Sequence, residues 1–403
     1  MIPMPPFPFT PLRFILRALL FFAFAVNTAG AQSLPPSVEQ ALKRAQIPLS
    51  AVAAYVQDVD GGRPQVAHNA AQAMNPASTM KLLTTYAALE LLGPTYTWKT
   101  ETYAAGRLEG GVLHGNLILK GYGDPKLTME NFWLLLRRLR ALGLREIRGE
   151  LVLDRSYFEP AEYDPAKFDA EPLRPYNVGP DALLLNFKAV RFQFVPDADR
   201  KIVTVIPEPR PAGLEFAAAV RATDGACDDW RAGIKADFQS NGGSARASFS
   251  GSMPASCGER YWNASLLAQP YYVYGVFRQL WEELGGTLSG GWKDGAVPAD
   301  AKLLATSESA SNAELARDIN KFSNNVMARQ LYLTLGAEVL KQAGRSDRSA
   351  RVVQSWLAEK KLDFPELILE NGSGLSRQER ISAEHMGRLL LEAWHSAVMP
   401  ELM

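Results

Sequence analysis

The chain has 403 residues, and its 43 Lys and Arg residues equal its 43 Asp and Glu residues, so the formal net charge is zero. A balanced charge excludes a protein that binds nucleic acid through clustered basic residues, because that affinity depends on neutralising phosphates. Since one hydrophobic core rarely serves more than roughly 250–300 residues, we expect two or three domains.

The N-terminal segment, residues 1–31, is predicted to be a secretory signal peptide. Arg13 and Arg17 supply positive charge, the apolar run Ala18–Val26 is too short to cross a bilayer, and small residues follow at Ala29–Ala31. Cleavage there would release the mature protein into the periplasm. No later run is long and apolar enough for a transmembrane helix, so no stable membrane span is expected.

The first elements of the mature chain are predicted from its local patterns. Weak alternation from Val52 to Val56, followed by the polar and glycine-rich run Asp58–Gly62, predicts a strand that enters a tight turn. Apolar residues at helical spacing then begin just after Ser78 and predict a helix, which Gly93 and Pro94 end. Ser78 is therefore expected at a helix N-terminus.

The predicted secondary structure then changes twice along the chain, from helical to strand-like patterns and back to helical ones. Between Trp98 and Ser265, short strand-like runs are separated by Gly, Pro and Asp, with one helix predicted at Phe132–Leu142. After Pro270 helical patterns return, the longest of them at Asn312–Leu335. The mature chain is therefore divided into the first part of a core domain at 32–97, an inserted β-rich region at 98–265, and the second part of the core at 266–403.

Cys227 and Cys257 are the only cysteines, and we predict that they form a disulfide within the inserted region. In an exported protein an isolated pair is more often a disulfide than a reactive site, because the compartment is oxidising. The alternative is two reduced, buried thiols. A bridge closing a loop of about 30 residues would stabilise the fold by about 3–4 kcal/mol on the chain-entropy model.

Ser78 and Lys81 are the one pair in which a lysine follows a serine three positions later. Positions i and i+3 share a helix face, so the amine of Lys81 can reach the hydroxyl of Ser78. Lysine can act as the base that activates a serine if burial and a cationic neighbour lower its pKa. Free N–H groups at the helix N-terminus can bind an oxyanion. The alternative is a capped helix with a solvated lysine.

The string Asn75–Lys81, followed by an apolar helix, resembles the nucleophile motif of penicillin-binding proteins and serine β-lactamases. The second motif of that family, Ser-x-Asn, occurs once, at Ser323–Asn325. In the family the serine relays protons near the lysine and the leaving group, while the asparagine amide holds the substrate's amide carbonyl. The resemblance assigns these roles to Ser323 and Asn325, with a polar helix cap as the alternative.

The 245 positions between Ser78 and Ser323 resemble the spacing in low-molecular-mass class C penicillin-binding proteins, which are D-alanyl-D-alanine carboxypeptidases and endopeptidases. Strings at Gly115–Thr128 and Pro175–Phe187 resemble signatures of the inserted domains of that subgroup. Asn371–Arg377 resembles its Gly-Ser-Gly-Leu-Ser-Arg stretch, which we interpret as a loop that supports the core. The resemblance implies an α/β penicillin-binding transpeptidase fold, similar to serine β-lactamases, with helices on an antiparallel sheet and a large β-rich insertion.

The implied activity is hydrolysis of peptidoglycan stem peptides or cross-links through an acyl-enzyme on Ser78, with no cofactor. The implied partners are peptidoglycan peptides, with β-lactam antibiotics as covalent inhibitors. The four histidines lack metal-ligand spacing and no Gly-x-Ser-x-Gly elbow occurs, so neither a zinc peptidase nor a Ser-His-Asp hydrolase is expected.

The third motif of the family, Lys-Thr-Gly, does not occur in the 403 residues. In the family it lies several tens of residues beyond the Gly-Ser-Gly-Leu-Ser-Arg stretch, whereas only 26 residues follow Arg377 here. We therefore expect that the C-terminal part of the core is missing, including one oxyanion donor and the strand that binds the substrate's carboxylate. The first hypothesis is a serine peptidase whose chain continues, and the alternative is a catalytically inactive protein or fragment that binds the cell wall.

Overall fold

The computed structural model describes residues 33–402 and divides the chain into two compact units, with the boundary between Ala71 and Gln72. The predicted signal peptide lies outside the described residues. Among the helices of residues 33–402, none combines the length and the apolar character that crossing a membrane requires.

The first unit consists of short elements. They are α2 (Pro36–Arg44), the single-turn helix η1 (Leu49–Ala51), β1 (Ala54–Val56) and β2 (Val66–His68). β1 and β2 pair antiparallel. In the turn between them, the side chain of Asp58 accepts a hydrogen bond from the backbone N–H of Asp60 at 3.0 Å, which fixes the tight turn that the sequence predicts.

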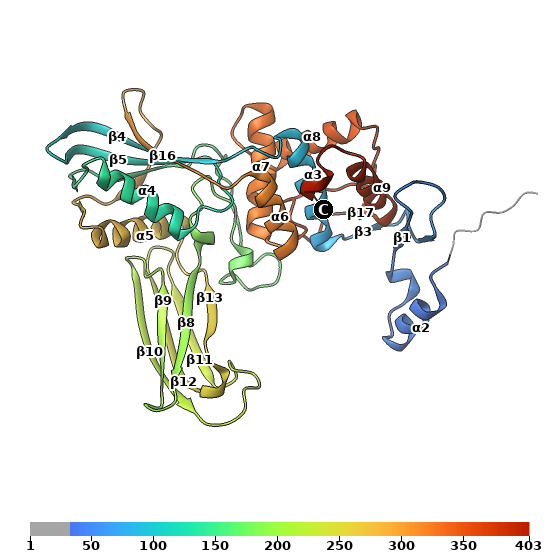
Figure 1. The fold of residues 1–403 in the computed structure, drawn as a ribbon, viewed down its shortest axis with the longest axis horizontal. Helices are drawn as coiled ribbons and strands as arrows, with labels where there is room; N and C mark the ends of the chain where they lie inside the picture. The colour runs from blue at the N-terminus through green and yellow to red at the C-terminus, as the bar shows by residue number, and fades with distance from the viewer. Residues whose placement is uncertain (1–32, 403) are drawn as a thin grey trace, which may run out of the picture. The chain divides into compact units, whose positions relative to one another are not determined.

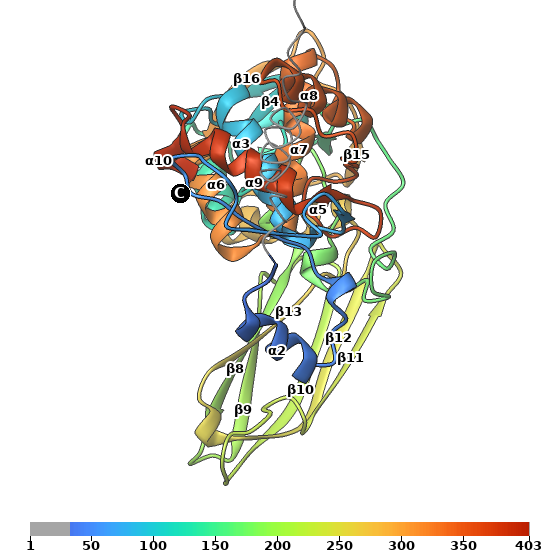
Figure 2. The ribbon, with the colours of Figure 1, turned by 90° about the vertical axis from the view of Figure 1, so that its right-hand side faces the viewer.

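One part of the second unit is helical, and its helices gather around one buried helix, α3 (Figures 1 and 2). Nine of the 12 residues of α3 are buried, because α6, α7, α8 and α9 cover it on several sides. A helix that is apolar on most of its circumference is stable only when it is surrounded in this way. The helices of this part are α3 (Met80–Leu91), α6 (Asn312–Phe322), α7 (Asn325–Leu340), α8 (Ser346–Glu359), α9 (Ala383–Trp394) and α10 (Met399–Leu402).

A two-residue strand pair ties the two ends of this helical part together. β3 (Ala73–Met74) pairs antiparallel with β17 (Ile381–Ser382), although more than 300 positions separate them in the sequence. Because β3 directly precedes the segment that carries Ser78, this pairing places that segment beside the stretch that ends at Arg377. In the described part of the chain, the helical region thus contains this short pair rather than a broad antiparallel sheet.

A seven-stranded sheet follows α3, with α4 and α5 on one face of it (Figure 1). Strand pairing extends the β-rich region to Glu308. The sequence pattern had predicted that this region ends at residue 265. β14, β15 and β16 complete the sheet that β4 to β7 begin, and α5 packs against α4 rather than in the helical core. The elements are β4 (Lys99–Glu109), β5 (Val112–Gly121), α4 (Met129–Ala141), β6 (Glu146–Ile147), β7 (Leu151–Asp154), α5 (Gln269–Glu283), β14 (Thr287–Leu288), β15 (Trp292–Asp294) and β16 (Lys302–Glu308).

The second sheet has six strands in the order β11-β12-β10-β9-β8-β13 and shares one hydrophobic core with the first. A disulfide joins Cys227, between β10 and β11, to Cys257, between β12 and β13; their Cα atoms are 4.9 Å apart, and both lie in the region where the sequence predicted them. The strands are β8 (Val190–Asp197), β9 (Ile202–Glu208), β10 (Leu214–Thr223), β11 (Ile234–Ser240), β12 (Ala245–Pro254) and β13 (Arg260–Ala264). Single-turn helices are η2 (Ala77–Thr79), η3 (Pro175–Asn177), η4 (Asn186–Lys188) and η5 (Ala255–Cys257).

Candidate active site

Ser78 lies in the single-turn helix η2, directly before the buried helix α3. The residue before it, Ala77, has a positive φ of 46°, which non-glycine residues adopt rarely. The side chain of Asn75 holds this conformation, because its Oδ1 accepts a hydrogen bond from the N–H of Ala77 at 2.9 Å. The turn leaves Ser78 exposed at the N-terminal end of a rigid helix.

Lys81 follows one turn later and is only 2% exposed. Its Nζ lies 3.1 Å from Oγ of Ser78, 2.6 Å from Oδ1 of Asn325 and 2.5 Å from the carbonyl oxygen of Ser373. The last two atoms can only accept hydrogen bonds, so they occupy the two hydrogens of a neutral amine. The nitrogen lone pair then faces the hydroxyl of Ser78, which is the arrangement required of a general base.

The surroundings favour the neutral form of Lys81. Burial, and to a smaller extent the positive charge of Arg329, lower the pKa of Lys81 from 10.5 to about 8, although the negative charge of Glu379 acts in the opposite direction. Arg329 is itself buried on α7, where its Nη1 donates to the carbonyl oxygens of Tyr176 and Val178 at 3.2 and 2.9 Å. The cationic neighbour that the sequence argument required is therefore a residue that the sequence did not single out.

Ser323 and Asn325 lie at a break between two helices, where the sequence predicted one helix from Asn312 to Leu335. α6 ends at Phe322, Ser323 adopts the left-handed conformation with φ of 51°, and α7 begins at Asn325. The side chain of Asn324 caps α7 by accepting from the N–H of Met327. The prediction of an unbroken helix is wrong, and the break turns Asn325 toward Lys81.

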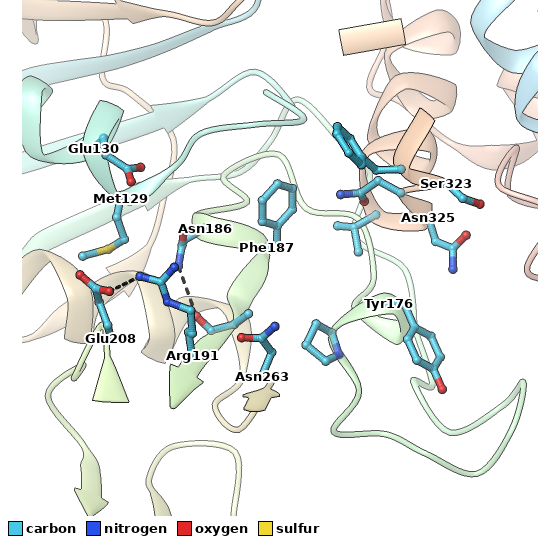
Figure 3. A pocket seen from close by; sticks show the side chains of 15 residues that line it. Met129, Glu130, Tyr176, Asn186, Phe187, Arg191, Glu208, Asn263, Ser323 and Asn325 are labelled. Atoms are coloured by element: carbon cyan, nitrogen blue, oxygen red, sulfur yellow. Dashed lines mark hydrogen bonds and ion pairs between the residues drawn. The ribbon is translucent and has the colours of Figure 1, made fainter. Parts of the chain in front are cut away.

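The structure brings Ser78, Lys81 and Asn325 into direct contact, whereas Ser323 has a different position. Its side chain is exposed and makes no hydrogen bond to any of residues 33–402. Figure 3 shows Ser323 and Asn325 side by side at one side of a groove. Ser323 is therefore free to contact a substrate that enters this groove.

The loop at Asn371–Arg377 contacts the amine of Lys81 directly, which goes beyond the supporting role inferred from the sequence. Ser373 contributes its backbone carbonyl to Lys81, and the fully buried Glu379 holds the loop. One oxygen of Glu379 accepts hydrogen bonds from three successive backbone N–H groups, those of residues 370, 371 and 372, at 2.9–3.1 Å. No sequence signal identifies Ser373, because its carbonyl would be present in any residue.

The described residues hold no group of three or more His, Cys, Asp or Glu side chains that could bind a metal ion. The side-chain groups that meet at Ser78 are a hydroxyl, an amine and an amide. These groups suit nucleophilic acyl transfer, in which a serine attacks a carbonyl and a buried lysine takes the proton.

Comparison with known proteins agrees with this chemistry. Residues 34–403 match the model of the D-Ala-D-Ala carboxypeptidase 3 (S13) family. A D-alanyl-D-alanine carboxypeptidase of Actinomadura sp. is 30% identical over 351 residues, which are 84% of this chain and 63% of that protein. D-alanyl-D-alanine carboxypeptidase DacB of Haemophilus influenzae is 26% identical over 334 residues, which are 79% of this chain and 66% of that protein. The chain therefore spans slightly less than two thirds of the length of these relatives.

The fold is also shared with a solved structure. Penicillin binding protein 4 (dacB) from Haemophilus influenzae superposes with a TM-score of 0.71 at 22% identity, covering 87% of this chain and 76% of that protein. The same protein complexed with a β-lactam superposes with a TM-score of 0.67. The predicted fold, a penicillin-binding transpeptidase type with an insertion, is thus confirmed.

Proposed function

The chain belongs to the D-Ala-D-Ala carboxypeptidase 3 (S13) family, and from this premise we propose that it is part of a serine peptidase that cleaves D-alanyl-D-alanine bonds in peptidoglycan peptides. The observation that carries the proposal is the buried amine of Lys81, which contacts Ser78, Asn325 and the carbonyl of Ser373 at once. Relatives named D-alanyl-D-alanine carboxypeptidase support the substrate class.

The proposed reaction has two steps. Lys81 takes the proton of the Ser78 hydroxyl as Oγ attacks the carbonyl carbon of the penultimate D-Ala, and the backbone N–H of Ser78 donates to the oxyanion that forms. The C–N bond then breaks, the leaving amine receives the proton by way of Lys81 or Ser323, and an ester on Ser78 remains. Water hydrolyses that ester by the same proton path in reverse. The side chain of Asn325 holds the substrate amide during both steps.

The proposed function also includes export to the periplasm and covalent inhibition by β-lactams. The sequence of residues 1–31 supports export to the periplasm, where peptidoglycan is found. β-lactams should acylate Ser78, because they mimic the D-alanyl-D-alanine amide and open on attack. The β-lactam complex of the related penicillin binding protein 4 supports this expectation.

The direct test is performed on the full-length gene product. It should release D-Ala from a pentapeptide ending in D-Ala-D-Ala, and penicillin should block this release by adding its mass to the tryptic peptide that contains Ser78. If the protein binds peptidoglycan but releases no D-Ala and gains no adduct, the alternative of an inactive cell-wall-binding protein is correct.

The pH dependence of acylation should report the protonation state of Lys81. Its pKa is about 8, and only the neutral amine can accept the proton of Ser78, so the acylation rate should rise about tenfold per pH unit at lower pH and level off above about pH 8. Stopped-flow measurement of penicillin acylation between pH 6 and pH 10 checks this. A rate that is flat over that range would mean that Lys81 is not the base.

A further inference from the structure

The helix α4 carries large apolar side chains on its outer face as well as on its inner face (Figure 1). The inner face packs in the core of the insertion and consists of Phe132, Leu135, Leu136 and Leu139. On the outer face, the exposed fractions of Trp133, Leu134 and Leu142 are 38%, 51% and 58%. A surface helix normally carries polar and charged residues on its outer face, so these three side chains form an unusual apolar surface.

This part of the molecular surface is also basic. Residues 131–145 contain four arginines and no Asp or Glu, and the one acidic residue of α4, Glu130, lies in its first turn. Among residues 33–402, no carboxylate forms an ion pair with any of the four, which are Arg137, Arg138, Arg140 and Arg145. They contact backbone carbonyl oxygens and the rings of Trp133 and Trp281 instead. The positive charge is therefore not compensated within the described part of the chain.

The apolar and basic side chains are interleaved along two rows of the helix, each with a spacing of four positions. These rows are Trp133, Arg137 and Ala141, and Leu134, Arg138 and Leu142. The six residues are all exposed, and every other residue of 132–142 is buried or partly buried. Together they cover about 14 Å of helix and include no uncharged polar side chain. We call these six residues the α4 surface.

This composition matches the interfacial layer of an anionic lipid bilayer. Trp and Leu side chains are stable at the boundary between headgroups and acyl chains, and arginine side chains extend from that boundary to the phosphate groups. We propose that the α4 surface binds membranes that contain anionic phospholipid, with α4 parallel to the bilayer. This inference goes beyond the peptidase activity and does not depend on it. The proposed export would bring the protein to a compartment that membranes enclose.

Two other occupants fit the α4 surface less well. A second copy of the chain, docked through the same surface in a two-fold dimer, would bring the arginines of one copy against those of the other. An acidic protein could pair with the arginines. However, specific protein interfaces contain about one hydrogen bond per 100–200 Å², and the side chains of the α4 surface offer guanidinium groups alone for such bonds.

The test measures how the full-length gene product sediments with lipid vesicles. Wild-type protein should sediment with vesicles of phosphatidylglycerol and phosphatidylcholine, but not with vesicles of phosphatidylcholine alone. Arg137→Gln and Arg138→Gln should each weaken binding about fivefold, and Leu134→Gln should weaken it about five- to tenfold. Raising the salt from about 0.1 to about 1 M should also weaken binding, because the Debye length falls from about 10 to about 3 Å.

Arg351→Gln and Leu340→Gln are the matched controls. Arg351 is an exposed arginine of α8 that pairs with Asp347, and Leu340 is an exposed leucine at the end of α7. Each control makes the same chemical change as a test variant, but outside the insertion, so binding should change less than about twofold. Circular dichroism checks that every variant folds, without reference to peptidase activity.

Insertion of Trp133 is measured separately, with vesicles that also contain phosphatidylcholine brominated on its acyl chains. Bromine quenches the fluorescence of tryptophan side chains that reach the acyl chains. The emission of wild-type protein should therefore fall on binding. Trp133→Phe should still bind but lose this fall, because no other tryptophan belongs to the α4 surface.

Failure of wild-type protein to bind anionic vesicles, equal binding to neutral vesicles, or equal losses in test variants and controls would overturn the proposal. A dimer that Leu134→Gln dissociates would overturn it in favour of a second copy of the chain. Binding to soluble polyglutamate but not to vesicles would overturn it in favour of an acidic protein. None of these outcomes bears on the proposed function, because neither a peptide substrate nor Ser78 enters the measurements.

Discussion

Replacing Lys81 by methionine is expected to lower the rate at which penicillin acylates Ser78 by about 10⁴-fold or more. A general base contributes about 10²–10⁴ in rate, and residues that act as one unit show losses as large as that of the whole unit. Ser78→Ala should therefore abolish acylation, and the double variant should be no worse than either single one. Quantitative labelling with a fluorescent penicillin, read by intact mass, measures all three.

Methionine is the suitable replacement because Lys81 is buried, and a smaller side chain would leave a cavity that costs stability for an unrelated reason. Urea unfolding of Lys81→Met serves as the control for folding. Asn325→Ala should have a smaller effect, since the carbonyl of Ser373 still accepts from the amine. Rapid labelling of folded Lys81→Met would disprove the assignment of Lys81 as the base.

The contact between Ser78 and Lys81 is the easiest part of the site to anticipate from the sequence, because its geometry is local. Ser78 in η2 and Lys81 in the following α3 are three positions apart, and this spacing allows their side chains to meet. The place of Asn325 came from family resemblance, since 244 positions separate it from Lys81 and no local pattern links them. The sequence could not predict that Arg329 and the carbonyl of Ser373 lie near Lys81. Helix packing places Arg329 there, and the second group is a backbone atom that any residue would supply.

The break between α6 and α7 was not predicted from the periodicity of apolar residues. Residues 319–328 contain neither Gly nor Pro, so the helical spacing of apolar residues continues across them. The polar run Ser323–Asn325 was the available signal, because Ser and Asn are typical helix-capping residues. A serine in the left-handed conformation is unfavourable by itself, and tertiary packing has to stabilise it.

The end of the insertion was placed too early for a different reason. β14 and β15 contain only two and three residues, and they pair with strands about 140 positions earlier. The pattern of apolar residues shows that a helix follows residue 265, but it does not show against which hydrophobic core that helix packs. The ring of Phe277 on α5 lies 6.5 Å from that of Phe132 on α4, within the core of the insertion.

Gly374→Ala is expected to lower acylation of Ser78 by about 10²-fold and to destabilise the fold by about 3 kcal/mol or more. A Cβ at Gly374 would lie 1.7 Å from the carbonyl oxygen of Ala77 and 3.0 Å from the backbone nitrogen of Ser78. The loop and the nucleophile segment would have to separate. Because the N–H of Ser78 is the proposed oxyanion donor, its displacement removes a contact made in the transition state, which typically accounts for about 10²–10³ in rate.

The matched control is Gly143→Ala, which separates the clash from the cost of the backbone conformation. Gly374 and Gly143 both have positive φ, 79° and 96°, but a Cβ at Gly143 would meet nothing within 4 Å. Gly143→Ala should therefore lose only the roughly 1–2 kcal/mol of an alanine in the left-handed region, with acylation unchanged. Urea unfolding and penicillin acylation of both variants measure the two effects. If Gly374→Ala matches Gly143→Ala in both measurements, the close approach to Ala77 does not position the nucleophile, and the loop only supports the core.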